Sequence, residues 1–395
     1  MINKNLTNKL AWSLCFALCI QRLSMALGSI SWGIAILLFL ILIYKTQKND
    51  GKLIIGEEIR GYYTAYAICA LASIPSIFVA VDISGGIKLF LEMWVYRVMP
   101  FFMVTLFIKD TNLLKKLVLV FLAVLNIDCL VALGQVVLNL APRGWGFGGN
   151  TLHLASMLCV VIPMLLVVIW DKAFSDKEKR FALISIVCCC IGAIAGQSRG
   201  TWLTLAIVLP LLSIKYVINS SKKMFAMVAV CFVIVGIFMS SPRLMHRVES
   251  ISNVTTDRSN TCRLAVWQSG INMMMDHPVF GIGLGGFSEA YKTKYILPED
   301  TIKLSHAHNN LLQIGAETGL VGLLGFVYLN GYILIKTFFD WRKDYSPYSL
   351  MLLSGWLGFV IFGMFDLTID ASAVMKTLWF LLGTLLVFKN SKNNV

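Results

Sequence analysis

Two histidines and a set of arginines are the residues of this sequence best suited to chemistry. His306 and His308 lie in the segment Ser305-His306-Ala307-His308-Asn309, directly before a long apolar stretch. Imidazole is the side chain best placed to accept or donate a proton near neutral pH. A guanidinium group binds phosphate through a forked pair of hydrogen bonds and stabilises charge that develops on a leaving phosphate. Together these groups favour the transfer of a group from a phosphate-linked donor to a hydroxyl.

The elements that must position these residues are apolar helices. The chain has 395 residues, of which 57% are hydrophobic and 14% charged, and its mean hydropathy is +0.76. Soluble domains carry about 25% charged residues. The apolar residues here come in blocks of about 17–25, which is the length needed to cross a hydrocarbon core. We therefore predict an all-α, polytopic integral membrane protein built as a helical bundle.

About twelve transmembrane helices are expected. Residues 1–240 hold helices 1–9, residues 241–307 form one long loop on the non-cytoplasmic side with short interfacial helices, and residues 308–395 hold helices 10–12. The N-terminal basic segment is interpreted as the start of an uncleaved first span, because another apolar block follows at once. The expected spans are 10–26, 28–44, 62–81, 93–108, 113–138, 152–170, 181–197, 201–217, 223–240, 309–335, 348–365 and 371–388.

Lysine and arginine residues indicate the orientation. They gather in alternate short loops, such as Lys45/Lys48, Lys115/Lys116 and Lys172 to Arg180, which the positive-inside rule assigns to the cytoplasm. The net charge of +13 is thereby explained by topology. A nucleic-acid partner is excluded, because no basic stripe is interleaved with aromatic residues. The loops 81–92, 139–151, 197–200, 241–307 and 365–371 then face the opposite side.

Several arginines break this pattern because they lie on the non-cytoplasmic side. Arg199 is the sharpest case, in a short hairpin between two apolar helices, where a charge is costly unless it faces a cavity or a partner. Snorkelling to lipid headgroups is the structural alternative, above all for Arg97. Glu317, four residues after Gln313 on one helix face, also needs a partner, and an outer-side arginine is expected. The arginines are Arg97, Arg143, Arg199, Arg243, Arg247, Arg258 and Arg263.

Metal and nucleotide sites are not expected. Nine of the ten cysteines lie in apolar blocks, and only Cys262 lies in the long loop, so neither a zinc motif nor a disulfide framework is predicted. Gly281-Ile-Gly283-Leu-Gly-Gly286 has the GxGxxG spacing, but no strand precedes it, so we interpret it as a turn. Asn309 is a good helix N-cap. Gly319, Gly322 and Gly325 suit close helix packing.

The constellation suggests one reaction. Arginines, imidazoles and an apolar bundle that accommodates a lipid tail are all needed for transfer from a lipid-linked pyrophosphate to a hydroxyl acceptor. Because the sequence shows no acidic metal cluster, we expect metal-independent chemistry without a cofactor, in which arginines replace a cation.

These residues resemble the O-antigen ligase and polymerase superfamily. The signature is His306-Ala-His308-Asn309-x-x-Leu312 followed by Glu317-x-Gly319, and it resembles the family pattern most closely. Ser198-Arg199-Gly200-x-Trp202 and Arg263-x-x-x-Trp267 resemble further family pieces. The likeness covers residues from about 145 to 325. The turn Gly149-Asn150-Thr151 departs from the Asn-Pro-Asn pattern of many members, which leaves the roles of that turn and of His153 open.

The resemblance implies a glycosyltransferase in the inner membrane of a Gram-negative bacterium, with its active site facing the periplasm. Its donor would be an undecaprenyl-pyrophosphate-linked glycan and its acceptor lipid A–core, with inversion at the anomeric carbon. By this analogy His308 is the base, Arg199 and Arg263 grip the pyrophosphate, and Glu317 positions a neighbouring arginine or histidine. Candidate substrate-binding residues are Arg143, Arg258, His306, Asn309 and Glu317.

Two other functions stay open. An O-antigen polymerase would use the same donor but extend the lipid-linked glycan itself; we favour the ligase because the chain has one moderate outer loop. A polysaccharide or lipid transporter would place its substrate site at the midplane in broken helices. The unusual polar residues here crowd one face instead. Asp366 and Asp370 flank the last outer turn and are interpreted as helix ends or acceptor contacts.

Overall fold

The computed structural model describes residues 4–49, 53, 55–217, 239, 241–253 and 257–392. These residues form helices joined by turns, with no strand among them, so the all-α prediction is confirmed. The helices are α1 (Lys4–Ile20), α2 (Met25–Lys48), α3 (Glu57–Ser73), α4 (Pro75–Phe78), α5 (Ile83–Leu91), η1 (Glu92–Tyr96), α6 (Met99–Leu106), α7 (Thr111–Val137), η2 (Gly146–Gly148), α8 (Thr151–Trp170), α9 (Asp176–Gly196), α10 (Arg199–Val217), α12 (Pro242–Ser252), α13 (Arg258–Asp276), α14 (Phe287–Ala290), η3 (Tyr291–Tyr295), α15 (Asn310–Asp344), α16 (Pro347–Phe362) and α17 (Ser372–Lys392).

Long apolar helices account for the bundle. Eight helical segments in the described residues are long and apolar enough to cross a membrane, and α10 and α16 are shorter apolar helices. Eleven of the expected spans coincide with helices of the structure, although α1 begins and ends six residues earlier than expected. The expected span 223–240 lies outside the described residues, apart from Met239.

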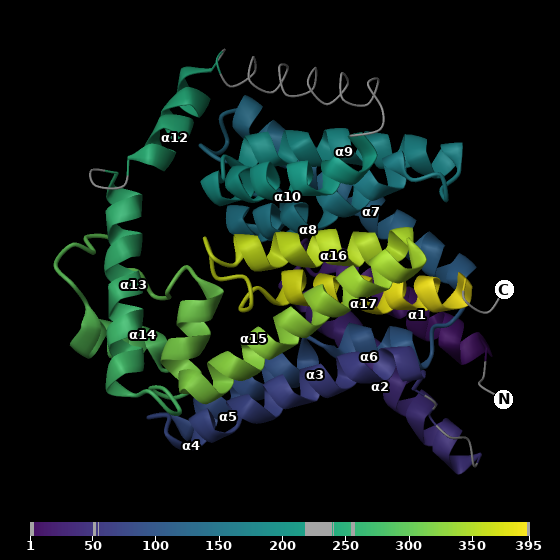
Figure 1. The fold of residues 1–395 in the computed structure, drawn as a ribbon, viewed down its shortest axis with the longest axis horizontal. Coiled ribbons are helices and arrows are strands. Elements are labelled where there is room, and N and C mark those ends of the chain that lie inside the picture. Colours follow the sequence, from purple (N-terminus) through teal and green to yellow (C-terminus); the bar gives the residue numbers. More distant parts are fainter. Residues whose placement is uncertain are drawn as a thin grey trace.

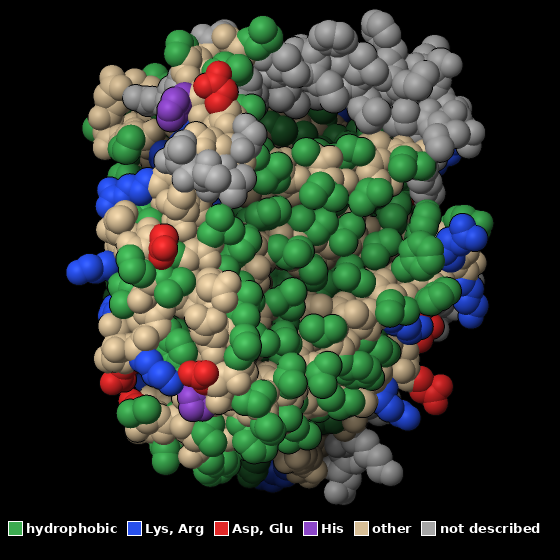
Figure 2. All heavy atoms as spheres, turned by 60° about the vertical axis from the view of Figure 1, so that its left-hand side comes forward, with side chains coloured by type: hydrophobic (Ala, Val, Ile, Leu, Met, Phe, Trp, Pro, Cys, Tyr) green, Lys and Arg blue, Asp and Glu red, His purple; other side chains and the backbone are tan. Residues whose placement is uncertain are grey.

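The most buried spans form the centre of the bundle. The apolar windows of α8 and α17 are 78% and 83% buried, whereas that of α2 is only 33% buried. α8 packs against α9 and α16, and α17 packs against α6 and α16. Figure 2 shows a broad hydrophobic surface along the side of the bundle, with charged side chains toward its margins. Exposed leucines such as Leu37 and Leu324 fit a helix surface in contact with lipid.

Helices α12, α13, α14 and η3 lie at one end of the bundle. In Figure 1 α13 runs across the ends of the bundle helices, and α12 continues from it toward α10. The turns 139–150, 197–198 and 363–371 open at this same end, which we call the loop end. The sequence predicted short helices here, but α13 has 19 residues and packs against α15. Its buried face, with Val266, Ser269 and Met273, explains its length.

Helix α15 is broken at Gly319, whose backbone is left-handed (φ 63°, ψ −165°). The turn that begins at His277 fills the break. The amides of Ile282 and Gly283 donate to the carbonyls of Ala316 and Glu317 (2.9 and 3.1 Å), and the amide of Leu320 donates to Pro278 (2.8 Å). The glycine segment 281–286 is therefore a turn, as predicted, and its task is to satisfy backbone groups that the broken helix leaves without partners.

Candidate active site

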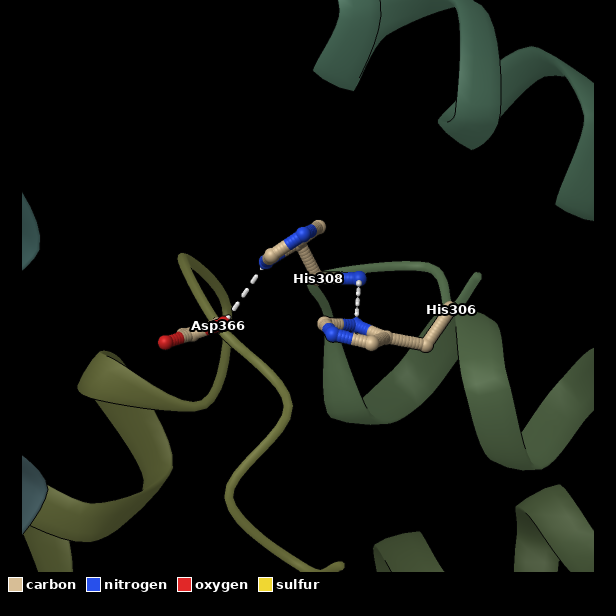
Figure 3. Close-up of side chains that lie close together, drawn as sticks. All are labelled: His306, His308 and Asp366. Carbon is tan, nitrogen blue, oxygen red and sulfur yellow. Dashed lines mark hydrogen bonds and ion pairs between the residues drawn. The ribbon is translucent and has the colours of Figure 1, made fainter. Parts of the chain in front are cut away.

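A histidine–aspartate pair forms the centre of the site. His308 directly precedes the N-cap of α15 and has a left-handed backbone (φ 47°). Its Nδ1 lies 2.7 Å from Oδ1 of Asp366, which is 3% exposed in the turn between α16 and α17 (Figure 3). A carboxylate accepts hydrogen bonds only, so the proton of the neutral imidazole lies on Nδ1. Nε2 is then the ring nitrogen that can accept a proton from a substrate.

His306 supports His308 from below in the view of Figure 3. The two imidazole rings lie 3.9 Å apart between centroids, and Nδ1 of His306 accepts a hydrogen bond from the backbone amide of His308 (3.3 Å). Burial, reinforced by the neighbouring His308, lowers the pKa of His306 to about 4. His306 is therefore neutral at physiological pH and fit to accept that hydrogen bond.

Two asparagines fix the turn that carries Asp366. Asn309 caps α15 as predicted, accepting from the amides of Leu311 and Leu312, and its Nδ2 donates to the carbonyl of Met364 (3.1 Å). Asn310 accepts from the amide of Thr368 (2.9 Å), and its own amide donates to the carbonyl of Gly363 (2.7 Å). The histidine segment and the Asp366 turn are thus held together by hydrogen bonds on both sides of the pair.

A cavity of about 210 Å³ opens beside His308 and Asp366. Four arginines from four different elements line it: Arg143, Arg199, Arg247 and Arg263. Its remaining walls are Leu152, Gln197, Ser198, Gly200, Ser259, Ile302, Leu304, Phe362 and Phe365. This volume is below the roughly 300–1,000 Å³ of pockets for drug-sized ligands. The cavity therefore suits a compact, strongly anionic group.

Arg199 joins α10 to the loop-end helices. It lies at the start of α10, and its Nη1 donates to the carbonyl and hydroxyl of Ser250 (3.2 and 3.0 Å) and to Oδ1 of Asp257 (3.1 Å). Partial burial favours the protonated form of Asp257. Hydrogen bonds from Arg199 and from the backbone amide of Asn260 outweigh it and hold the pKa of Asp257 below its ordinary value. The guanidinium of Arg199 has two further donor nitrogens, Nε and Nη2. One side chain can therefore hold α12 through Nη1 and still face the cavity.

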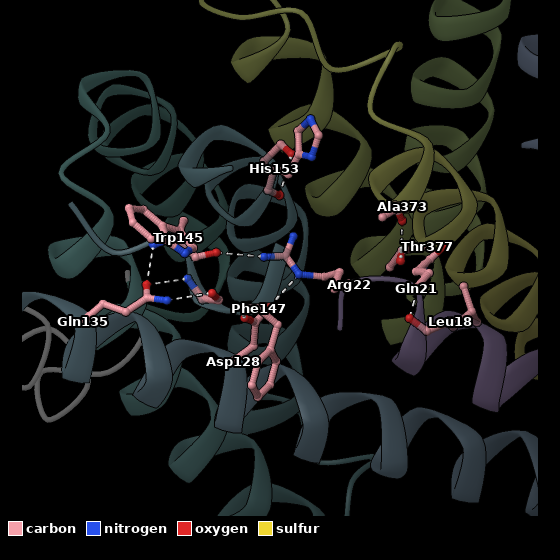
Figure 4. Close-up of polar contacts among 12 residues, drawn as sticks. Leu18, Gln21, Arg22, Asp128, Gln135, Trp145, Phe147, His153, Ala373 and Thr377 are labelled. Carbon is pink, nitrogen blue, oxygen red and sulfur yellow. Dashed lines mark hydrogen bonds and ion pairs between the residues drawn. The ribbon is translucent and has the colours of Figure 1, made fainter. Parts of the chain in front are cut away.

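Arg143 is placed by a loop that folds back onto the bundle. Its Nε donates to the carbonyl of Gly196 (3.0 Å), and Gly144 donates to Ala195 (2.9 Å). Further along the loop, the amide of Phe147 donates to one oxygen of Asp128 in α7, whose other oxygen pairs with Arg22 from the turn after α1 (2.6 Å; Figure 4). The loop is therefore pinned at both its ends. Gln135 adds bonds to Trp145 and Gly146.

Positive charge dominates the cavity. Burial, together with the charges of Arg247, Arg263 and Arg199, lowers the pKa of Arg143 to about 10. Burial also lowers the pKa values of Arg263 and Arg247, and Arg199 adds to both effects. All of these groups stay protonated at neutral pH, and the carboxylates that act on them, Asp257 and Asp366, are fewer than the arginines. An anion is the ligand that would relieve this repulsion.

The structure could also accommodate a cation at the histidines. Ligand atoms of His306, His308 and Asp366 all lie within 4.8 Å of one another, a grouping that the sequence did not predict. Two imidazoles and a carboxylate are ligands for zinc or another transition metal. The four guanidinium groups beside them oppose a divalent cation by electrostatic repulsion. The charge of the surroundings therefore favours an anion next to the pair over a metal on it.

Besides His306, which lies beside His308, three predicted residues lie outside the cavity. Arg258 does not line the cavity: its side chain donates to Oγ1 and the carbonyl of Thr301 (2.9 and 3.1 Å). Glu317 is 5% exposed, and its Oε1 accepts from Gln313 (2.9 Å) and from the amide of Phe287 (3.3 Å). The expectation of an arginine partner for Glu317 is wrong, because no guanidinium among the described residues pairs with it. The side chain of Asn309 is engaged in the capping contacts given above.

Arg97 does not snorkel to lipid headgroups. It is 2% exposed and lies 2.9 Å from Glu92 and 3.3 Å from Asp370, with a further bond to the carbonyl of Ile369. Burial among acceptors explains why this arginine is tolerated near an apolar helix. It holds the start of α17 against η1 and stabilises the turn in which Asp366 lies.

A larger cavity of about 810 Å³ opens elsewhere at the loop end, between residues 79–89 and 276–295. Val79, Phe280 and other apolar residues line it, and its charged groups are mainly acidic. Asp276, one of these acids, is already paired with Lys294 (2.9 Å). Size alone favours this cavity, but the convergent arginines and the imidazole lie in the smaller one. We therefore place the candidate active site there.

A family model for O-antigen ligase matches residues 184–327. Over this segment the chain is similar to the O-antigen ligase family. The resemblance expected from the sequence is thereby confirmed. The matched segment includes Arg199, Arg247, Arg263 and His308, whereas Arg143 and Asp366 lie outside it. Segments on both sides of the matched region therefore complete the candidate site.

Two curated relatives are similar to this chain. An O-antigen ligase of Salmonella typhimurium is 26% identical over 223 residues, which is 53% of either chain. An uncharacterized protein of Haemophilus influenzae is 20% identical over 189 residues, or 44% of this chain and 46% of that one. The chain spans about half the length of the curated relatives it matches. Both relatives are proteins of bacteria, and the long apolar helices fit a membrane protein.

Three residues of the site were not identified as such from the sequence. Asp366 stood among two aspartates with open roles, and Arg247 among seven arginines without distinction. Asn310 carried no signal beyond following Asn309. The positions of all three depend on contacts between distant segments: Asp366 is 58 residues from His308 in the chain. Polar residues clustered in outer turns were the available signal, and they indicated the correct end of the bundle.

Proposed function

We propose that this protein is a glycosyltransferase of the O-antigen ligase type. It transfers a glycan from undecaprenyl pyrophosphate to a sugar hydroxyl of lipid A–core at the periplasmic face of a bacterial inner membrane. The observation that carries the proposal is the shared cavity: four guanidinium groups lie beside a histidine whose Nδ1 is held by a buried carboxylate. The ligase domain match at residues 184–327 supports the same class of reaction.

The arginines bind the pyrophosphate. A glycan-linked lipid pyrophosphate carries two negative charges as a diester, and the product pyrophosphate gains negative charge when the sugar–oxygen bond breaks. Four guanidinium groups with Asp257 and Asp366 nearby provide a net positive environment for that gain. Because these groups are fixed before the reaction, they stabilise the leaving group without further reorganisation.

His308 activates the acceptor. Nε2 takes the proton of the acceptor hydroxyl while its oxygen forms a bond to the anomeric carbon of the donor sugar. The bond from that carbon to the phosphate oxygen breaks, and its electron pair remains on the pyrophosphate. Asp366 stabilises the resulting imidazolium through Nδ1. Attack opposite the leaving group inverts the anomeric centre, and His308 then releases its proton to water.

A deletion strain examined for lipopolysaccharide banding tests the proposal. Loss of all polymer from lipid A–core, with polymer accumulating on undecaprenyl pyrophosphate, is the expected result. Complementation with wild-type protein should restore banding, and His308→Ala should not, although its abundance in the membrane stays normal. Transfer by the His308→Ala protein would contradict the proposed base. A core bearing a single repeat unit would instead indicate a polymerase, and loss of donor on the periplasmic side would indicate a transporter.

A further inference from the structure

A buried chain of hydrogen bonds reaches the histidine segment from inside α15. Oε1 of Gln313 accepts from the backbone amide of Ala307 (2.9 Å), and Nε2 of the same side chain donates to Oε1 of Glu317 (2.9 Å). That carboxylate oxygen also accepts from the backbone amide of Phe287 (3.3 Å). Ala307 is fully buried, Gln313 is 7% exposed and Glu317 is 5% exposed. Hydrogen bonds in such surroundings are costly to lose.

The carboxylate determines which way the Gln313 amide faces. An amide group presents an oxygen acceptor and a nitrogen donor, and either end can in principle face either neighbour. A carboxylate only accepts, so Glu317 requires Nε2 on its side. The oxygen of Gln313 must then face Ala307, whose backbone amide can only donate. Glu317 thus acts on the histidine segment through the orientation of Gln313.

The histidine segment needs such a support. His308 has a left-handed backbone (φ 47°), a conformation that costs energy for a residue other than glycine and persists when its surroundings fix it. Asn309 and Asp366 hold the segment on one side. On the side of α15, the described contact to the backbone between the two histidines is the one from Gln313.

The far end of this series of hydrogen bonds, at Glu317, is equally well fixed. Phe287 closes the glycine turn that is inserted into the break of α15 at Gly319, where Gly283 donates to the carbonyl of Glu317. Phe287 is itself 1% exposed. A rigid turn and a rigid helix end therefore anchor Glu317. A residue that positions another side chain needs such a fixed anchor.

We propose that Gln313 and Glu317 are positioning residues for His308: together they hold the Ala307 amide and so place the imidazole between Asp366 and the arginine-lined cavity. This inference rests on the proposed function, in which His308 is the base. Gln313 does not touch substrate in this arrangement. Disturbing it should therefore lower kcat, because the base is misplaced, while KM for the donor stays near its normal value.

Exchanging the two side-chain types provides the test. In Gln313→Glu two carboxylates face each other, so the acceptor of the Ala307 amide is displaced; we expect kcat at neutral pH to fall roughly 10- to 100-fold. Glu317→Gln alone should be mild, because its oxygen can still accept both bonds. The double variant Gln313→Glu/Glu317→Gln reverses the polarity of the bond between positions 313 and 317 and again fixes an oxygen of residue 313 toward the Ala307 amide, whereas the Phe287 amide, which shares Oε1 of Glu317 with Gln313, loses its acceptor. Its kcat should return to within about threefold of wild type.

The assay uses the full-length protein in lipid nanodiscs. The donor is undecaprenyl-pyrophosphate-linked O-antigen glycan, and the acceptor is lipopolysaccharide from the deletion strain. Thr318→Val is the matched control, since it removes a buried hydroxyl of the same helix whose bond runs to Ile314 rather than to the histidines. Hydrogen–deuterium exchange of segment 304–310 reports the Ala307 amide directly and should rise in Gln313→Glu and fall back in the double variant.

Several outcomes would overturn the inference. Unchanged kcat in Gln313→Glu, or a double variant that folds but stays as slow as the single one, would show that the pair does not place His308. If Gln313→Glu fails to accumulate, Gln313→Met is measured instead, and wild-type kcat in that variant would count equally against the proposal. Activity of His308→Ala would remove the proposed base, whereas a failed exchange with an inactive His308→Ala would remove only the positioning role.

Discussion

Nδ1 of His308 and Oδ1 of Asp366 lie 2.7 Å apart, although 58 residues separate them in the chain. The pair joins the N-terminal end of α15 to the turn between α16 and α17. His308 faces the cavity in which four arginines converge, so the pair lies at the border between an acceptor side and an anion-binding side. This relationship gives the first and most direct test of the site.

Replacing Asp366 by Asn should impair catalysis without impairing donor binding. The amide can turn its NH₂ group toward Nδ1, which selects the wrong tautomer and withdraws the charge that stabilises the imidazolium. We expect kcat to fall roughly 10²- to 10⁴-fold with little change in donor KM. Asp370→Asn is the control from the same turn, because its side chain is 62% exposed and pairs with Arg97. Equal losses in both variants would argue for a merely structural turn.

Arg199→Lys should be harmful although the charge is kept. One Nη atom of Arg199 donates to Ser250 and Asp257, and the rest of the fork is available to the cavity. A lysine ammonium is a single point of charge and cannot serve both places. We expect kcat/KM to fall at least about tenfold. Arg180→Lys, at an exposed position at the start of α9, should be silent. A fully active Arg199→Lys protein would count against the pyrophosphate contact.

Arg247 and Arg258 provide a matched pair of arginines from neighbouring helices. Arg247 lines the cavity, whereas Arg258 is exposed and bonds to Thr301. Arg247→Ala should raise the donor KM roughly tenfold or more, because a guanidinium–phosphate contact in a buried site is strong. Arg258→Ala should leave KM within about twofold. Steady-state kinetics with varied donor distinguishes them, and the reverse order of effects would refute the assignment of the cavity as donor site.

His306 predicts how stability depends on pH. Its pKa is lowered to about 4 in the folded protein, below the value of about 6.5 expected when unfolded. Between these values the unfolded state binds more protons, so stability should fall as the pH drops from about 6.5 toward 4. The Tm of the protein in nanodiscs should fall less over this range in His306→Gln than in wild type. Parallel curves for the two proteins would show that His306 does not titrate as inferred.

The apolar blocks and the polar outer residues made much of this structure predictable. Each block long enough to cross a bilayer became a helix wherever the structure describes it, because hydrocarbon leaves no other way to satisfy the backbone. His308 and Arg199 could be singled out because imidazole and guanidinium groups are expensive at a membrane face, and Arg263 was singled out by the family resemblance. All three line one cavity.

Contacts between distant segments were not predictable. Nothing in the spacing pairs His308 with Asp366, or separates Arg247 from Arg258. The helix break at Gly319 was also missed, since Gly319, Gly322 and Gly325 share a spacing that suits packing. Only Gly319 has a positive φ, and the turn that stabilises it begins about forty residues earlier, at His277. Such a break is decided by tertiary contacts rather than by local preference.

Gly319→Ala tests whether the break is required. At φ 63° an alanine is strained, and its Cβ would overlap the backbone of Val279, which belongs to the inserted turn. Neither backbone can move without breaking bonds such as Leu320 to Pro278. We expect Tm to fall by several degrees and transfer activity to fall with it, because Glu317 and Gln313 lie directly before the break. Gly331→Ala in the same helix meets nothing within 4 Å and should not lower Tm. If both variants behave alike, α15 tolerates a continuous helix at Gly319, and the glycine turn is not what holds the histidine segment in place.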